Sequence, residues 1–211
     1  MDLYRMGLWQ VFLAGGPVMW PILLCSIFAL AIILEKFSHL RKIKIDTREF
    51  LDKVLDKIKH HQIKEALQAC DEARNPVSNI LKAGILKYDR PRDQIKEAIE
   101  DASLYEIPKL EKNLTLLATL AHISPLLGLL GTVTGMVRCF QAIQAKTIAF
   151  HPVSPGDLAG GIWEALLTTV AGLAVAIPAF VAYNYLVSRI DNFILEMEKA
   201  STELVNFLTE Q

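Results

Sequence analysis

The sequence has few cysteines, and their spacing matches no disulfide or metal-binding pattern. Cys25, Cys70 and Cys139 form no CxxC pair, so we interpret them as small packing residues. The hydrophilic part has no Walker loop, HExxH or GxSxG motif, which are the common signatures of nucleotide, zinc and serine chemistry. His60 and His61 have no partner cluster for a metal and are interpreted as surface residues. These absences argue against an enzyme and against a metal or other cofactor.

A strong net charge is absent as well. The 211 residues contain 22 Lys and Arg against 23 Asp and Glu, giving a net charge of −1. A chain that binds nucleic acid is usually basic, so no nucleic-acid partner is expected. Alternating strand patterns, repeats of fixed period and low-complexity linkers are also missing from the sequence, which favours a helical protein.

Charge is missing altogether from three long stretches. They lie between Arg5 and Glu35, between Lys112 and Arg138, and between Glu164 and Arg189. Each exceeds the roughly 20 residues that a helix needs to cross a hydrocarbon core of about 30 Å. The first is too long for a cleavable signal peptide and lacks a basic leader. The sequence therefore predicts an all-α integral membrane protein with three transmembrane helices, embedded in a lipid bilayer.

Basic residues beside the spans set the expected orientation. Lys36, Arg41, Lys42, Lys44 and Arg48 follow the first stretch, whereas Arg5 alone precedes it. Positive charge favours the cytoplasmic side, so the N-terminus is expected outside and the C-terminus inside. The predicted segments are an interfacial helix at 1–16, spans at 17–35, 113–145 and 159–187, a cytoplasmic helical domain at 36–112, a periplasmic loop at 146–158 and a cytoplasmic helical tail at 188–211.

Helical patterns continue through the hydrophilic part. Asp46 followed by Glu49 predicts a helix start, and further short helices are expected over residues 62–73 and 77–88. From Pro91 the apolar period runs without a clear stop into the second span, which predicts one very long helix with possible kinks at Pro108 and Pro125. The third span continues past Arg189 in the same way. Two helices are therefore expected to extend far into the cytoplasm.

The last two spans carry small residues at helical spacing. In ISPLLGLLGTVTGM (residues 123–136), Gly128, Gly131 and Gly135 offer a surface for close helix packing, with Gly131 and Gly135 spaced as GxxxG. In the third span a narrow stripe of small residues comprises Ala165, Gly172, Ala176 and Ala179. Pro178 is expected to kink this span. Since three helices enclose little by themselves, these small-residue faces predict a homo-oligomeric ring.

Hydroxyl groups are the main polar groups at the centre of these spans. Thr132 and Thr169 are expected at matched depths because the two helices run antiparallel, and they predict a polar pathway. The competing interpretation is that each threonine bonds a carbonyl of its own helix. His122 is a candidate proton relay, or else a histidine bonded to a neighbouring helix. Glu164 is expected at the outer mouth with Arg138, where the two either pair or extend toward water.

A threonine hydroxyl orients water but does not release a proton at physiological pH. If the assembly conducts protons, the titrating group at the membrane centre must come from another protein. The sequence therefore predicts a partner with an acid inside the membrane.

Two motifs resemble a known family. GLLGTVTGM (128–136) and GGIWEALLTTVAGLAVAIPAFVAYNYL (160–186) look like the paired signature of the ExbB/TolQ/MotA proton-channel family, and GGPVMWPILL (15–24) extends the likeness to the first span. Three spans are more similar to ExbB and TolQ than to the flagellar stator MotA. The sequence departs from the family pattern at Thr134, where tryptophan is frequent, at Gly160, where proline is frequent, and at Arg138, an added charge.

The resemblance implies an inner-membrane homopentamer around two copies of an ExbD- or TolR-like subunit, whose single span brings an essential aspartate. Proton flow would then energise a TonB- or TolA-like protein that acts on the outer membrane, without a bound cofactor. The same resemblance assigns Thr132 and Thr169 to pore positions and Glu164 to the acidic position that opens the third span. A secondary transporter is disfavoured because inverted repeats and a central charged site are missing. A non-conducting scaffold would not need matched hydroxyls.

Overall fold

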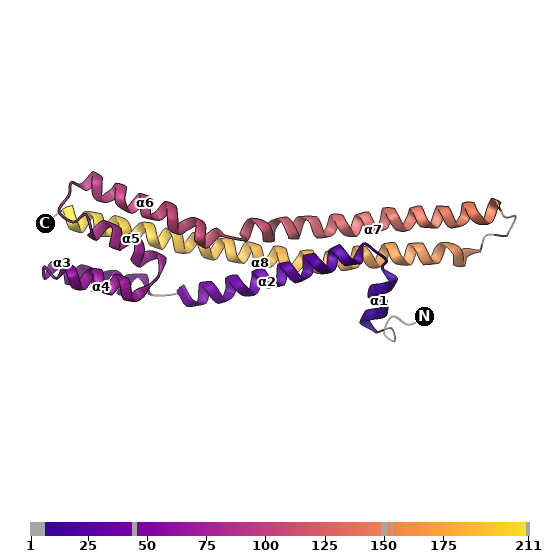
Figure 1. The fold of residues 1–211 in the computed structure, drawn as a ribbon, viewed down its shortest axis with the longest axis horizontal. Helices are drawn as coiled ribbons and strands as arrows, with labels where there is room; N and C mark the ends of the chain where they lie inside the picture. The colour runs from indigo at the N-terminus through magenta and orange to yellow at the C-terminus, as the bar shows by residue number, and fades with distance from the viewer. Residues whose placement is uncertain (1–6, 44–45, 149–151, 153, 210–211) are drawn as a thin grey trace. The chain divides into compact units, whose positions relative to one another are not determined.

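The computed structural model describes residues 7–43, 46–148, 152 and 154–209, and this part of the chain is helical (Figure 1). Its helices are α1 (Leu8–Ala14), α2 (Met19–Ile43), α3 (Thr47–Lys59), α4 (Ile63–Ala73), α5 (Pro76–Ile85), α6 (Arg92–Glu111), α7 (Leu114–Ile148) and α8 (Pro155–Thr209). The described residues include no strand, so the all-α prediction is confirmed. Of the predicted interfacial helix at 1–16, residues 1–6 lie outside the described part.

Three helical stretches are long and apolar enough to cross a membrane, as the charge-free runs predicted. They fall within Met19–Lys59, Arg92–Ile148 and Leu158–Thr209. Large apolar side chains remain exposed along them, among them Phe28, Leu126, Val170 and Ile177. A protein in water buries most of such a surface, whereas lipid tails cover it in a bilayer. The chain is therefore a multi-pass membrane protein.

The chain divides into two compact units. The first contains residues 1–35 and 113–184, and the second contains residues 36–112 and 185–211. In the first unit, α7 and α8 lie side by side (Figure 1). Their contacts pair early residues of one helix with late residues of the other, so the two helices are antiparallel.

The long helix predicted from Pro91 into the second span is interrupted, so that prediction is wrong. α6 ends at Glu111 and α7 begins at Leu114. Between them Lys112 is extended, with ψ of 137°, and Asn113 is left-handed, with φ of 67°. Asparagine visits the left-handed region more readily than other residues with a side chain. The backbone preference of one residue thus ends a helix that the apolar period alone would continue.

Two side-chain hydrogen bonds flank this break, and one of them satisfies a backbone carbonyl that the break leaves free. In the second unit, Lys36 Nζ donates to the carbonyl of Leu110 at 2.8 Å, which supplies one of the donors that the last turn of α6 lacks. In the first unit, Asn113 Nδ2 donates to Glu35 Oε2 at 3.0 Å. These contacts stabilise the interruption on both sides.

The prolines that were expected to kink the helices lie within continuous ones. Pro108 is inside α6, Pro125 inside α7 and Pro178 inside α8. Each helix runs on past its proline, and the kinks expected at these prolines stay predictions. The third span does continue beyond Arg189, as predicted, because α8 is unbroken from Pro155 to Thr209.

Short capped helices build the second unit. Asp46 accepts hydrogen bonds from the backbone N–H groups of Arg48 at 3.1 Å and Glu49 at 3.2 Å, which confirms the predicted start of α3. At the start of α5, Asn75 and Ser78 form a reciprocal capping box, an arrangement that satisfies two otherwise free N–H groups. The local sequence therefore sets where these helices begin.

The second unit also has its own core. Gly84 of α5 lies against Ile99 of α6 and Leu204 of α8, and a Cβ at this glycine would be 2.8 Å and 3.1 Å from their side chains. Cys70 of α4 is buried, and this burial, assisted by the charge of Asp71, raises the pKa of its thiol to about 11. A thiol that stays protonated at neutral pH is a poor nucleophile. Its environment fits a packing role.

Candidate functional site

Glycines bring α7 and α8 into backbone contact. A Cβ at Gly128 would lie 2.9 Å from the Thr168 carbonyl oxygen, and one at Gly135 would lie 2.7 Å from that of Gly161. Cβ contacts under 3.0 Å essentially never occur in real structures. Glycine is therefore required at these positions, and such close approach is how membrane helices gain packing energy.

We call this contact the interhelical seam. It comprises Gly128, Gly131 and Gly135 of α7 with Gly161, Ala165, Thr168 and Gly172 of α8. The sequence predicts a homo-oligomer from these small-residue faces. The structure instead uses them within one chain, because the two antiparallel neighbours cover each other's small faces. The seam therefore carries no argument for a ring.

Thr168 was missed by the sequence argument, although it lies at the centre of the seam. Its side chain is fully buried. Its Oγ1 donates to the Ala165 carbonyl at 2.8 Å and approaches the Gly128 carbonyl of α7 at 3.4 Å. It also occupies the space beside Gly131, where a Cβ would be 2.7 Å from the Thr168 Cγ2 atom. One signal was available: Thr168 follows Ala165 by three residues and precedes Gly172 by four, so it belongs to the same helical stripe.

Thr132 and Thr169 lie at the edge of the seam and are partly buried. Thr132 Oγ1 donates to the carbonyl of Leu129 in its own helix at 2.6 Å. Thr169 Oγ1 is 3.3 Å from the Ala165 carbonyl and 3.4 Å from the Gly128 carbonyl across the seam. Thr132 therefore bonds its own helix, whereas Thr169 has both an own-helix contact and a contact across the seam.

These two hydroxyls lie at one level of the helix pair. Thr132 directly follows Gly131, which contacts Thr168, and Thr169 is the next residue of α8. One residue shifts the height along a helix by only about 1.5 Å. Each hydroxyl uses its proton within the chain, yet its oxygen keeps capacity to accept another hydrogen bond. The edge of the seam thus offers two acceptor oxygens at similar depth.

His122 lies apart from these hydroxyls and is exposed. Its Nδ1 is 2.7 Å from the carbonyl of Ala118 in the preceding turn. The ring also packs edge-on against Phe180 of α8, with ring centroids 5.8 Å apart. The sequence offered a proton relay or a bond to a neighbouring helix. The hydrogen bond is instead made within α7, and the contact to α8 is aromatic.

Arg138 and Glu164 form an ion pair between α7 and α8. The carboxylate is largely shielded, with 15% of its side chain exposed, whereas the arginine side chain is 46% exposed. Gly16, in the turn before α2, lies against both side chains. The sequence left two arrangements open for these side chains, an ion pair or extension toward water, and the structure shows the ion pair. The ion pair joins three segments of the first unit, since the turn at Gly16 closes over it.

Replacing Gly16 by alanine is expected to destabilise the chain by about 2 kcal/mol. Gly16 has φ of 71°, and an added Cβ would clash with the Glu164 carboxylate. Thermal unfolding in detergent, followed by helix content, measures the effect. Gly7→Ala is the matched control, because nothing lies within 4 Å of that position. Adding Glu164→Ala should relieve the clash but keep the backbone strain at residue 16. If the destabilisation of the double variant equals the sum of the two single changes, Gly16 and Glu164 are not in contact.

Comparisons with known proteins identify the family of the chain. Residues 72–199 match the model of the MotA/TolQ/ExbB proton channel family. The chain is 32% identical over 190 residues to a protein of Methanothermobacter thermautotrophicus named as an ExbB homolog, covering 90% of this chain and 66% of that relative. It is 32% identical over 178 residues to the Tol-Pal system protein TolQ of Haemophilus influenzae, covering 79% of this chain and 76% of the relative.

A third relative is the biopolymer transport protein ExbB of Aquifex aeolicus, which is 36% identical over 118 residues, 56% of this chain and 76% of that protein. The matched region of the family model includes α7 and the seam residues of α8. The structural features and the sequence comparisons thus lead to one assignment. The chain belongs to the MotA/TolQ/ExbB proton channel family.

Proposed function

We propose that the chain is an ExbB- or TolQ-like subunit of a proton-driven motor in the bacterial inner membrane. It assembles as a homopentamer around an ExbD- or TolR-like partner and energises a TonB- or TolA-like protein for outer-membrane transport or maintenance. The observation that carries this proposal is the pair of hydroxyls, Thr132 and Thr169, at one level of a helix pair that has no carboxylate at its centre. The chain acts without a cofactor and is not an enzyme.

The hydroxyls suit a partner that carries a titrating acid. A protonated carboxyl group has an O–H that must be donated, whereas a carboxylate only accepts. Because Thr132 and Thr169 already donate within the chain, their free lone pairs favour the protonated form of an acid beside them. A partner aspartate would thus be stabilised in its neutral form while it crosses the hydrocarbon, where a charge is expensive.

The remaining residues have supporting roles in this proposal. Glu164 and Arg138, with opposite charges at one end of the seam, form the polar mouth through which protons enter or leave. His122 lies nearer to the other end of the charge-free run, ten residues after Lys112, and serves as an exit relay. The N-terminus is then periplasmic and the C-terminus cytoplasmic, as the basic residues after the first span favour.

Two other functions fit some of these features less well. A MotA-like stator belongs to the same family, but the relatives named above are ExbB and TolQ proteins. A non-conducting scaffold needs the glycines of the seam but has no use for acceptor oxygens at one depth. The hydroxyls therefore favour the motor subunit.

Co-reconstitution tests the proposal directly. The full chain is expressed with an ExbD- or TolR-like single-span protein, and both are purified and placed in liposomes with a pH-sensitive dye. We expect co-purification, negligible proton flux through this chain alone, and loss of energised function when the partner's intramembrane aspartate becomes asparagine. Robust flux through the lone chain that His122→Ala abolishes would instead support a histidine relay that conducts without a partner acid, and would contradict the proposal.

A further inference from the structure

Two arginines in the second unit are stacked on aromatic rings. Arg41 of α2 places its guanidinium carbon 4.4 Å from the centre of the Phe37 ring. Arg189 of α8 lies 5.4 Å from the centre of the Tyr185 ring, and its Nε donates to the Tyr185 hydroxyl at 3.1 Å. The two rings are themselves neighbours, with centroids 6.3 Å apart. We call these four residues the aromatic–arginine cluster.

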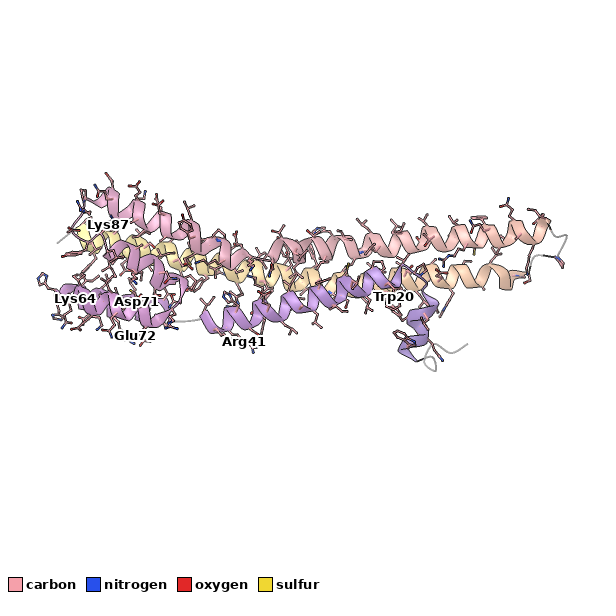
Figure 2. All side chains as sticks on the ribbon, in the orientation of Figure 1. Trp20, Arg41, Lys64, Asp71, Glu72 and Lys87 are labelled. Atoms are coloured by element: carbon pink, nitrogen blue, oxygen red, sulfur yellow. The ribbon has the colours of Figure 1, made fainter. Side chains whose placement is uncertain are left out.

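The cluster is exposed, and no carboxylate among the described residues forms an ion pair with it. All four residues are exposed, and Figure 2 shows Arg41 near the end of α2. Within the described part of the chain neither arginine forms an ion pair with a carboxylate. Stacking on a ring holds a guanidinium in place but leaves its outward N–H groups free. Two ordered guanidinium groups can thus donate hydrogen bonds to a molecule outside the chain.

The sequence places this cluster at the border of the hydrocarbon. The first charge-free run ends at Glu35, two residues before Phe37, and the third ends at Arg189 itself. Tyrosine favours the headgroup level of a bilayer, and arginine extends its charged end toward that level. Further basic residues follow in the sequence at Lys42 and Lys44.

We propose that the aromatic–arginine cluster binds the phosphodiester headgroup of an anionic phospholipid. A guanidinium matches the geometry of phosphate oxygens with two parallel hydrogen bonds, and basic clusters next to a span attract anionic lipids. This inference depends on the chain crossing a membrane and is independent of the motor proposal.

Lipid retention by the purified full chain tests the site. The protein is delipidated in detergent and titrated with phosphatidylglycerol, with phosphatidylcholine or with glycerol phosphate, and bound lipid is measured by native mass spectrometry. We expect phosphatidylglycerol to bind in preference to phosphatidylcholine, and glycerol phosphate not to displace it. The double variant Arg41→Gln/Arg189→Gln should weaken phosphatidylglycerol binding about tenfold or more, because two charge-assisted contacts are lost.

Three further variants separate a built site from general attraction. Lys42→Gln removes one neighbouring exposed charge and should bind as the parent does. Arg41→Lys/Arg189→Lys keeps both charges but loses the planar guanidinium groups that donate two parallel hydrogen bonds, so it should bind phosphatidylglycerol more weakly than the parent. Tyr185→Phe removes only the hydroxyl that holds Arg189 and should weaken binding by less than the double glutamine change, which provides a mild variant that folds normally.

Several outcomes would overturn the site. These are equal retention of the two lipids, a loss in Lys42→Gln as large as in the double glutamine variant, and parent-like binding by the lysine pair. Competition by glycerol phosphate at equal concentration would likewise show a free phosphate site instead of a lipid site. Helix content and elution volume of each variant confirm that binding is compared between folded proteins.

Discussion

Replacing Gly131 by leucine is expected to prevent α7 and α8 from packing. A Cβ at this position would overlap Thr168 Oγ1 and Cβ and lie 2.7 Å from its Cγ2. Thr168 is fully buried and has nowhere to move. Overpacking costs about 1 to 3 kcal/mol for a few added methylenes, and a whole leucine at a backbone contact should exceed that. We expect loss of most folded protein, measured as protease resistance and monodisperse elution in detergent.

A matched control and a rescue make this result specific. Gly160→Leu adds the same side chain one residue from the seam, where nothing lies within 4 Å, and should leave folding unchanged. Gly131→Ala should be destabilised, and adding Thr168→Gly should restore stability because it removes all three overlapping atoms. A double variant no more stable than Gly131→Ala would show that these residues are not in contact.

The same variant decides what the glycines do. If Gly131 lay between subunits instead of within one chain, Gly131→Leu would give a folded protein with a smaller oligomeric state. The structure predicts loss of the fold itself, because the seam lies inside the first unit. Native mass spectrometry distinguishes the two results, and a well-folded monomer would contradict the seam.

Thr132→Val and Thr169→Val are expected to assemble normally but lose most energy-dependent function. Valine keeps the shape of threonine but lacks the oxygen that we propose accepts a hydrogen bond from the partner's acid. An unpaired polar group in such a site costs about 1 to 3 kcal/mol, which corresponds to roughly a fivefold to hundredfold loss of rate if it falls on the conducting step. Energised function is measured per assembled complex, with the chain's own partner present.

Two comparisons separate a pore role from a packing role. Thr132→Ser and Thr169→Ser retain a hydroxyl and should keep more function than the valine variants. Thr168→Val, one residue from Thr169 but buried in the seam, should lower stability by about 1 kcal/mol while the folded fraction still works. If both edge variants assemble and function like the parent, each threonine merely bonds its own backbone and the pore role is wrong.

Much of the local structure could be predicted from the sequence. The absence of charge from three long runs identified the spans, because a charged side chain in hydrocarbon is costly whatever its neighbours. The start of α3 at Asp46 followed from a side chain that bonds the next N–H groups of the backbone. The glycine and alanine spacing of the last two spans also identified which faces pack closely. These features depend on residues that are near one another in the sequence.

Other features depended on the packed helices. The sequence predicts Thr132 and Thr169 as the central hydroxyls, but Thr168 fills the space beside Gly131, which is visible only when α8 lies against α7. The break at Asn113 was missed because the apolar period continues through it, and its energetic reason includes contacts from Lys36 and Glu35, far away in the sequence.

By itself the sequence determined that this chain crosses a membrane with three helices and has small, hydroxyl-bearing faces on two of them. Hydropathy and side-chain volume act locally, so they can be recognised without a partner surface. Only the tertiary structure decided which surface each face meets. It paired the glycines of α7 with α8 of the same chain, closed Gly16 over the Arg138–Glu164 ion pair, and left Thr132 and Thr169 at the edge of the seam. Close packing depends on three-dimensional complementarity between distant segments, and a linear pattern does not specify that.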